Sequence, residues 1–277
     1  METDSNLSTT DQWIAHIDDL LSLLSAFNDM AIMAPDTPHD KEAAKVVAFK
    51  FVQAVRTLRA TVVLSKAGDS SNAIILTRSM LENFIDAVFL MRNPKEIWRY
   101  LEEAADLESK MEISRRKYNP QNEGPNFGTR PSSVQLRQQF QSLGDQHSTI
   151  RSWRKLNLRT RAERAEHSNI LALYEMIYPL TSAYAHGSST ILMEYLREPI
   201  DHETGFHFSY TPNDAEVEVA LTWGAMIFLG FLACMDILMD IGLRDRLERL
   251  SQRELELMSI TQDNMLARRI GRKSPAP

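Results

Sequence analysis

The chain has 277 residues, of which 43% are hydrophobic and 25% are charged, and its formal net charge is −6. These values are typical of a globular protein with a sizeable core, and the net charge alone argues against a general nucleic-acid binder. The only cysteine, Cys234, lies in an apolar run, which excludes an intrachain disulfide and predicts a small core residue. The N-terminal segment METDSNLSTT is acidic and polar, unlike a signal peptide, so we expect a cytoplasmic protein.

Capping residues, prolines and glycines divide the chain into a series of helices. An irregular loop at 118–133 contains three prolines and two glycines and interrupts this series. The predicted fold class is therefore all-α, a multi-helix bundle. The expected helices cover about 9–33, 40–67, 70–92, 93–117, 132–143, 146–156, 158–167, 168–196, 214–242 and 244–268.

Two segments depart from plain helical patterning. Residues 197–212 alternate polar and apolar side chains around a Thr-Gly turn, which predicts one small β-hairpin inserted in the bundle. Residues 219–235 form an apolar run of 17 residues. Since a membrane span needs about 20, we expect a buried central helix and no stable membrane insertion.

The predicted organisation has three consecutive parts. An N-terminal helix with its linker occupies 1–38, the helical-bundle core domain occupies 39–245, and a C-terminal helix with a basic tail occupies 246–277. We find no internal repeat that would suggest a solenoid.

Polar side chains recur every fourth residue in two otherwise apolar helices. The first stripe consists of Arg78, Glu82 and Asp86, and the second of Tyr178, Ser182, His186 and Thr190. Residues four apart lie on one helix face, so each set forms a narrow polar stripe. If the two stripes face each other, they form a polar site inside the bundle; the alternative is a solvated face with an Arg–Glu pair.

Histidine titrates near neutral pH, so His186 is the candidate general acid or base. Tyr174, Tyr178 and Ser182 offer hydroxyl groups nearby, and Gly187 allows close approach of a ligand. The alternative for His186 is a hydrogen-bonded core residue. A serine nucleophile at Ser182 lacks the nucleophile elbow that such enzymes use.

No motif for a metal, a P-loop or a dinucleotide occurs, so we expect neither a metal site nor a cofactor. Between Arg115 and Arg164, eleven Lys or Arg face three acidic residues, a formal charge of about +8. This window suits an anionic partner such as RNA, with Trp153 stacking on a base and Arg154 contacting phosphate. Alternatively, the arginines pair with acidic helices and Trp153 anchors a short helix to the core.

Three motifs taken together resemble a known family. They are RSMLENFID at 78–86, SW at 152–153 before an Arg-rich helix, and YxxxYxxxSxxxHGS from residue 174. Over about 45–245 the chain resembles a widespread bacterial all-helical domain family of unknown function that looks distantly related to the HEPN (higher eukaryotes and prokaryotes nucleotide-binding) superfamily. HEPN proteins are typically dimeric helical bundles, and many are metal-independent endoribonucleases in toxin, abortive-infection or antiviral systems. The resemblance therefore implies a HEPN-like core and a homodimer.

One part of the HEPN pattern is missing. Its catalytic histidine usually follows an arginine by a short spacing, but Thr181, Leu180 and Pro179 stand where that arginine would be. The string from Arg161 to His167 fits the spacing by chance. Arg78, from the other helix, is the candidate for the missing cation.

The sequence thus supports two functions. The first is a HEPN-like RNA-directed protein, a metal-independent endoribonuclease of host defence or a toxin system. In it His186 is the acid or base, Arg78 stabilises the phosphate and Glu82 orients one of them, while other stripe residues bind the ligand. The alternative is a non-catalytic binding or regulatory module with a polar ligand pocket. The expected ligand-binding residues are Asp86, Tyr178, Ser182, Trp153 and Arg154.

Overall fold

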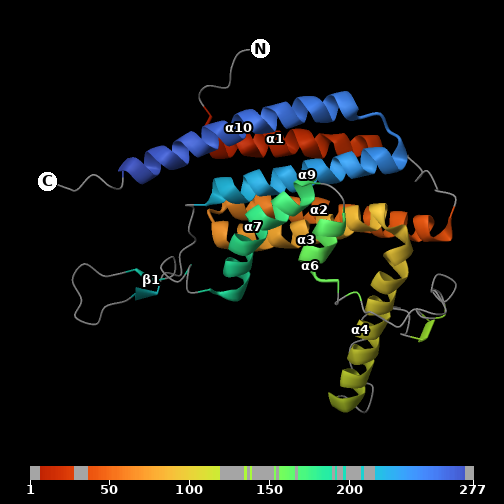
Figure 1. Cartoon of the computed structure of the whole chain (residues 1–277). Coiled ribbons are helices and arrows are strands. Elements are labelled where there is room, and N and C mark those ends of the chain that lie inside the picture. Colours follow the sequence, from red (N-terminus) through yellow and green to blue (C-terminus); the bar gives the residue numbers. More distant parts are fainter. Residues whose placement is uncertain are drawn as a thin grey trace. The chain divides into compact units, whose positions relative to one another are not determined.

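A computed structural model describes eleven stretches of the chain (Figure 1). These are residues 7–27, 37–118, 134–135, 138, 153, 156–165, 168–188, 191, 196–197, 207–208 and 216–271. The helices are α1 (Thr9–Ser22), η1 (Leu23–Phe27), α2 (Pro38–Lys66), α3 (Ser70–Arg92), η2 (Pro94–Glu96), α4 (Ile97–Tyr118), α6 (Leu158–Arg164), α7 (Ser168–His186), α9 (Val217–Met239) and α10 (Arg244–Gly271).

The fold is an all-α bundle, which confirms the predicted class. The extended structure within the described stretches consists of β1 (Leu196–Arg197) and β2 (His207–Phe208). They pair antiparallel, with Leu196 opposite Phe208. Each strand has only two residues, too few to form a sheet that packs against the core. The turn that would join the two strands lies outside the described residues. The β-hairpin at 197–212 therefore stays a prediction.

Two helices end earlier than their patterns predict. The first α-helix stops at Ser22 and is followed by the short 3-10 turn η1, whereas an end near residue 33 is expected. Residues 28–33 lie outside the described residues. The helix expected over 168–196 stops at His186, because Gly187 takes a positive φ of 60° and the Ser188 N–H donates to the Ala183 carbonyl oxygen. This left-handed glycine cap ends a helix. The expected helices at 132–143 and 146–156 fall almost wholly outside the described residues.

The chain forms two compact units that do not follow the order of the sequence. Unit 1 consists of Met1–Met33, Ala48–Phe84 and Ala172–Pro277, and unit 2 consists of Ala34–Val47 and Ile85–Leu171. The division therefore passes through α2, α3 and α7. It is a different division from the predicted one, whose boundaries at 38/39 and 245/246 follow helices along the chain.

In unit 1, α9 packs against both α1 and α10, and the three helices lie side by side (Figure 1). On α9, Phe228 stacks on Phe51 of α2, and Phe231 contacts Phe84 of α3. Helix α9 is thus the central helix expected from its apolar run. It is long and apolar enough to cross a membrane, but 67% of its apolar window is buried within the protein. A core helix passes the same test, so its composition alone is weak evidence for a span.

Unit 2 contains the end of α3, then η2, α4 and α6. Helix α6 begins at Leu158, and its cap residue Asn157 accepts a hydrogen bond from the Thr160 N–H. Asn93 joins two parts of the unit, because its side-chain amide donates to the carbonyl oxygens of Phe89 and Arg164. These contacts hold α6 to the turn between α3 and α4.

Candidate functional site

Parts of the two polar stripes meet in unit 1, where Arg78 on α3 lies against α7. Its Nη1 lies 3.5 Å from Ser182 Oγ and 3.1 Å from His186 Nε2, and its Nη2 donates to Tyr178 Oη at 3.1 Å. Its Nε donates to Glu82 Oε1 at 2.9 Å, one turn along α3. The guanidinium therefore joins every described residue of the second predicted stripe. The last member of that stripe, Thr190, lies outside the described residues. We call these five residues the Arg78 cluster: Arg78, Glu82, Tyr178, Ser182 and His186.

The Arg78 cluster is partly shielded from water. The Arg78 side chain is 16% exposed, whereas the Glu82 side chain is 42% exposed and His186 is exposed. Charge-assisted hydrogen bonds are stronger when they are shielded than when both partners are in water. The cation is thus held at a fixed position with its histidine partner at the surface, where a ligand can reach the ring.

The tautomer of His186 follows from its contact with Arg78. A guanidinium carries five N–H donors and no acceptor, so the Nε2 atom facing it must be the acceptor. The neutral ring then carries its proton on Nδ1. Nε2 is the atom able to take a proton from a ligand, once Arg78 Nη1 turns towards another acceptor.

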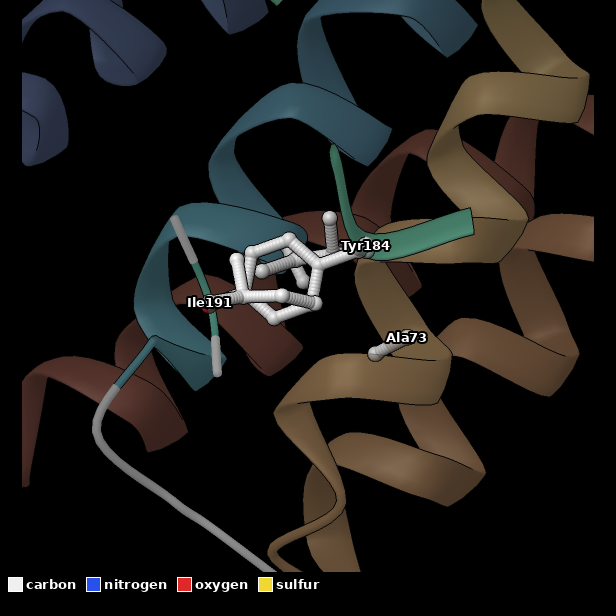
Figure 2. Packing of buried hydrophobic residues seen from close by; sticks show 5 residues of the cluster. Ala73, Tyr184 and Ile191 are labelled. Atoms are coloured by element: carbon white, nitrogen blue, oxygen red, sulfur yellow. The ribbon is translucent and has the colours of Figure 1, made fainter. Parts of the chain in front are cut away.

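The end of α7 that carries His186 is fixed by a small apolar cluster. Tyr184 and Ile191 pack together beside Ala73 of α3 (Figure 2), and Ile74 and Ala220 complete the cluster. The Tyr184 hydroxyl donates to Glu216 Oε2 at 2.6 Å, just before α9 begins. His186 lies two residues beyond Tyr184, so this packing determines the position of the imidazole at the protein surface.

Aromatic rings continue the Arg78 cluster along α7. The rings of Tyr174 and Tyr178 stack with their centroids 4.8 Å apart, and Arg78 Cζ lies 4.9 Å from the centre of the Tyr178 ring. Both tyrosines are half-buried. A cation above an aromatic face is attracted by the negative face of the ring, which adds to the hydrogen bonds that orient the guanidinium.

Asp86 and Trp153, two other predicted binding residues, belong to unit 2. Arg161 Nη1 lies 2.6 Å from Asp86 Oδ1, and Arg161 Cζ lies 4.8 Å from the centre of the Trp153 ring. The indole also meets Phe89 and Tyr100 edge-on and is only 6% exposed. Trp153 thus anchors a short segment to the core, the alternative that the sequence left open, and offers little surface to a base. Arg154 lies outside the described residues.

Ion pairs take up much of the basic window where it is described. Arg159 pairs with Glu163, Arg161 with Asp86, and Arg164 with Glu96. Such pairs reduce the field that would attract an anion. Within the described stretches, the window therefore fits the alternative of paired arginines better than a surface that steers RNA.

No group of three or more His, Cys, Asp or Glu able to hold a metal ion occurs among the described side chains. The donor set of the Arg78 cluster is itself unsuited to a cation, because its centre is a guanidinium. What it can hold is an anion that replaces one of the groups now bound to Arg78.

A buried histidine–carboxylate pair was missed by pattern analysis. His16 Nε2 on α1 lies 3.4 Å from Glu254 Oε2 on α10, and both residues are buried. Burial raises the pKa of Glu254 above its usual value of 4.5, while the hydrogen bond and charge of His16 act in the opposite direction. One signal in the sequence could have indicated that His16 is buried: it shares a helix face with the apolar residues Trp13, Ile17 and Leu20.

Replacing Glu254 by glutamine is expected to change the pH dependence of stability. Since the folded pKa is raised, the folded chain holds this proton more tightly than the unfolded chain. The contribution of Glu254 is thus most favourable below pH 4.5 and is lost as pH rises through the folded pKa. Glutamine stays neutral, so the free energy of unfolding of Glu254→Gln should rise relative to that of wild type as the pH increases from 4.5 through the raised pKa of Glu254.

Urea titrations at several pH values measure this difference. Glu256→Gln is the control, because its carboxylate lies on the same helix and its side chain is 53% exposed. For the control, the difference from wild type in the free energy of unfolding should stay constant with pH. The same constant difference for Glu254→Gln would contradict a raised pKa of Glu254.

The sequence matches one family model. Residues 44–204, more than half of the chain, match the model described as a family of unknown function, DUF5677. No curated protein and no solved structure matches the chain.

Proposed function

This chain belongs to the DUF5677 family, and we propose that it is an RNA-directed protein that cleaves RNA without a metal, using Arg78 and His186. The proposal extends to a HEPN-like arrangement of the core, a homodimer, and a cytoplasmic role in host defence or a toxin system. The family description carries no activity, so the proposal depends on the chemistry of the Arg78 cluster.

One observation carries the proposal: Arg78 Nη1 and His186 Nε2 are 3.1 Å apart. The sequence has no arginine at the expected short spacing before His186, and Arg78 supplies one from the neighbouring helix. An arginine beside a histidine combines a fixed positive charge for a phosphate with a group that moves protons near neutral pH. RNA cleavage by its own 2′-hydroxyl requires these two functions.

The proposed step begins when a backbone phosphate takes the place of His186 at Arg78 Nη1. Nε2 is then available and removes the proton from the ribose 2′-hydroxyl. The 2′-oxygen forms a bond to phosphorus, the bond from phosphorus to the 5′-oxygen breaks, and that oxygen takes a proton from water. Arg78 stabilises the charge of the pentacoordinate phosphate, and the products are a 2′,3′-cyclic phosphate and a 5′-hydroxyl.

The other members of the Arg78 cluster position the cation. Glu82 holds Nε, and Tyr178 holds Nη2, so Nη1 can exchange partners while the guanidinium plane stays in place. Ser182, at 3.5 Å from Nη1, makes the longest contact and is the partner most readily displaced along with His186.

The test is incubation of the full chain with total RNA in EDTA, comparing wild type with His186→Ala and Arg78→Ala. We expect wild type to cleave and both variants to lose cleavage while they remain folded. Arg244→Ala is the matched control, because Arg244 Nε also pairs with a glutamate four residues later, at 3.1 Å, in an exposed position. Variants with a lowered Tm, together with an inactive wild type, would indicate a purely structural cluster.

A second function, a non-catalytic binding module, is favoured by one specific observation. All three nitrogens of the Arg78 guanidinium already contact protein groups, as expected for a preformed cluster that stabilises the fold. In that case an anion would bind to the protein and raise its Tm, but RNA would stay intact in every variant. Melting curves with inorganic phosphate and with RNA separate the two functions.

A further inference from the structure

The Arg78 cluster continues, through the ring of Tyr178, to a second ring that the proposed cleavage step does not use. Tyr174 and Tyr178 are one helical turn apart on α7, and their planes differ by only 23°. Tyr178 has a second role, because its hydroxyl accepts a hydrogen bond from Arg78. Tyr174 stacks on the Tyr178 ring and has no part in the proposed cleavage step.

Two parallel phenol rings and a cation suit a ligand that combines a flat ring with an anion. Aromatic side chains bind the bases of single strands by stacking, which tolerates any base because each has a π face. In a duplex the bases are already stacked and paired, so their faces are not accessible. An unpaired base joined to a phosphate therefore matches the arrangement.

The positions and the exposure of the two tyrosine rings support the binding of an unpaired base. The ring centroids are 4.8 Å apart, and the guanidinium carbon is 4.9 Å from the Tyr178 centroid, so the three groups form a continuous row. Both rings are half-buried, which fixes them while leaving part of each accessible. Fixed aromatic rings bind with little loss of side-chain entropy.

We infer that the Tyr174–Tyr178 pair is a base-binding subsite for single-stranded RNA, beside the phosphate held by Arg78. This inference rests on the proposed function and specifies its substrate class. A base packed against the pair places a backbone phosphate of the same strand near Arg78. Cleavage is then confined to unpaired RNA.

The experiment measures the binding of a fluorescent 2′-O-methyl oligonucleotide to the full chain in EDTA at a fixed salt concentration. This probe lacks the attacking hydroxyl, so binding is measured without cleavage. We expect Tyr174→Leu, which keeps apolar volume but has no ring, to weaken binding about tenfold or more. Tyr174→Phe keeps the ring and should stay within roughly twofold of wild type. Phe49→Ala is the control, since Phe49 is a 55% exposed aromatic residue on α2 outside the Arg78 cluster.

Two further probes identify what is bound. A duplex of the same sequence, and a single strand without bases, should each bind at least about tenfold more weakly than the intact single strand. Equal affinity for these probes, or wild-type affinity in a folded Tyr174→Leu variant, would overturn the subsite. Binding of AMP as tight as that of the strand, with the same dependence on Tyr174, would also overturn it in favour of a free nucleotide.

The inference and the proposed function can fail separately. If ordinary RNA stays intact while the 2′-O-methyl strand binds with the expected dependence on Tyr174, then cleavage is refuted and the base subsite stands. If RNA is cleaved equally well in paired and unpaired regions by wild type and Tyr174→Leu, the subsite is refuted and cleavage stands.

Discussion

Replacing Arg78 by lysine is expected to lower RNA cleavage about 100- to 1000-fold, although the positive charge is kept. The guanidinium contacts Glu82, Tyr178, Ser182 and His186 from a single rigid plane. A lysine ammonium is a single point on a flexible chain and cannot meet these groups and a phosphate together. The change also removes partly shielded hydrogen bonds, so we expect stability to fall by about 1 kcal/mol.

The measurement is the initial rate of cleavage of a defined RNA in EDTA, together with Tm. Arg244→Lys tests the same replacement in an exposed pair and should leave both values at those of wild type. An Arg78→Lys variant with full activity would show that charge alone is sufficient and that the fork geometry of Arg78 has no part in the reaction.

Replacing Gly230 by alanine is expected to destabilise unit 1 by about 2 kcal/mol. An added Cβ would lie 2.5 Å from Cζ of Phe84 and 3.0 Å from its nearer Cε, closer than packed atoms allow. Phe84 is only 4% exposed and contacts Phe231, so its ring has little space into which to move. The better helix propensity of alanine offsets only a part of this cost, about 1 kcal/mol.

Urea unfolding of two further variants isolates the steric cause. Gly224→Ala gains the same helix propensity on α9, but its Cβ would meet the flexible end of Leu58 at 3.1 Å, so the loss should be smaller. In the double variant Gly230→Ala with Phe84→Leu, removing the ring should recover part of the stability lost by Gly230→Ala alone. Equal effects of the two glycine replacements would contradict the close contact with Phe84.

Much of the fold could be predicted because local signals determine helices. Pro94 and the residues at 68–70 set helix limits close to those found, and the apolar run at 219–235 correctly indicated the central helix α9. The end of α7 was missed because glycine inside an apolar pattern is compatible with either a helix or its cap. Only the tertiary contacts of Tyr184 and Ile191 favour the cap.

The site could be predicted in part. Four-residue spacing on two helices indicated facing stripes, and the contacts of Arg78 with Tyr178, Ser182 and His186 confirm that these parts of the stripes meet. Their catalytic and binding roles stay predictions. The spacing of residues along one helix does not show which neighbouring helix each of them faces. Asp86 follows the spacing of the first stripe, but it pairs with Arg161 of α6 and not with a residue of α7.

The Tyr174–Tyr178 stack was less accessible to sequence analysis. Tyr174 is four residues before Tyr178, so the spacing placed it on the same face, but only the structure shows parallel rings that lead to Arg78. The buried pair of His16 and Glu254 joins residues 238 positions apart, and no local pattern links them. Long-range pairing of this kind depends on how helices pack rather than on their periodicity.

Cleavage of RNA by Arg78 and His186 through the RNA's own 2′-hydroxyl is tested most directly by identifying, by mass spectrometry, the ends of RNA incubated with the full chain in EDTA. We predict 2′,3′-cyclic phosphate and 5′-hydroxyl ends, formed by wild type and absent with His186→Ala. Intact RNA at an excess of folded wild-type protein, or products that carry 5′-phosphate ends, would contradict the claim.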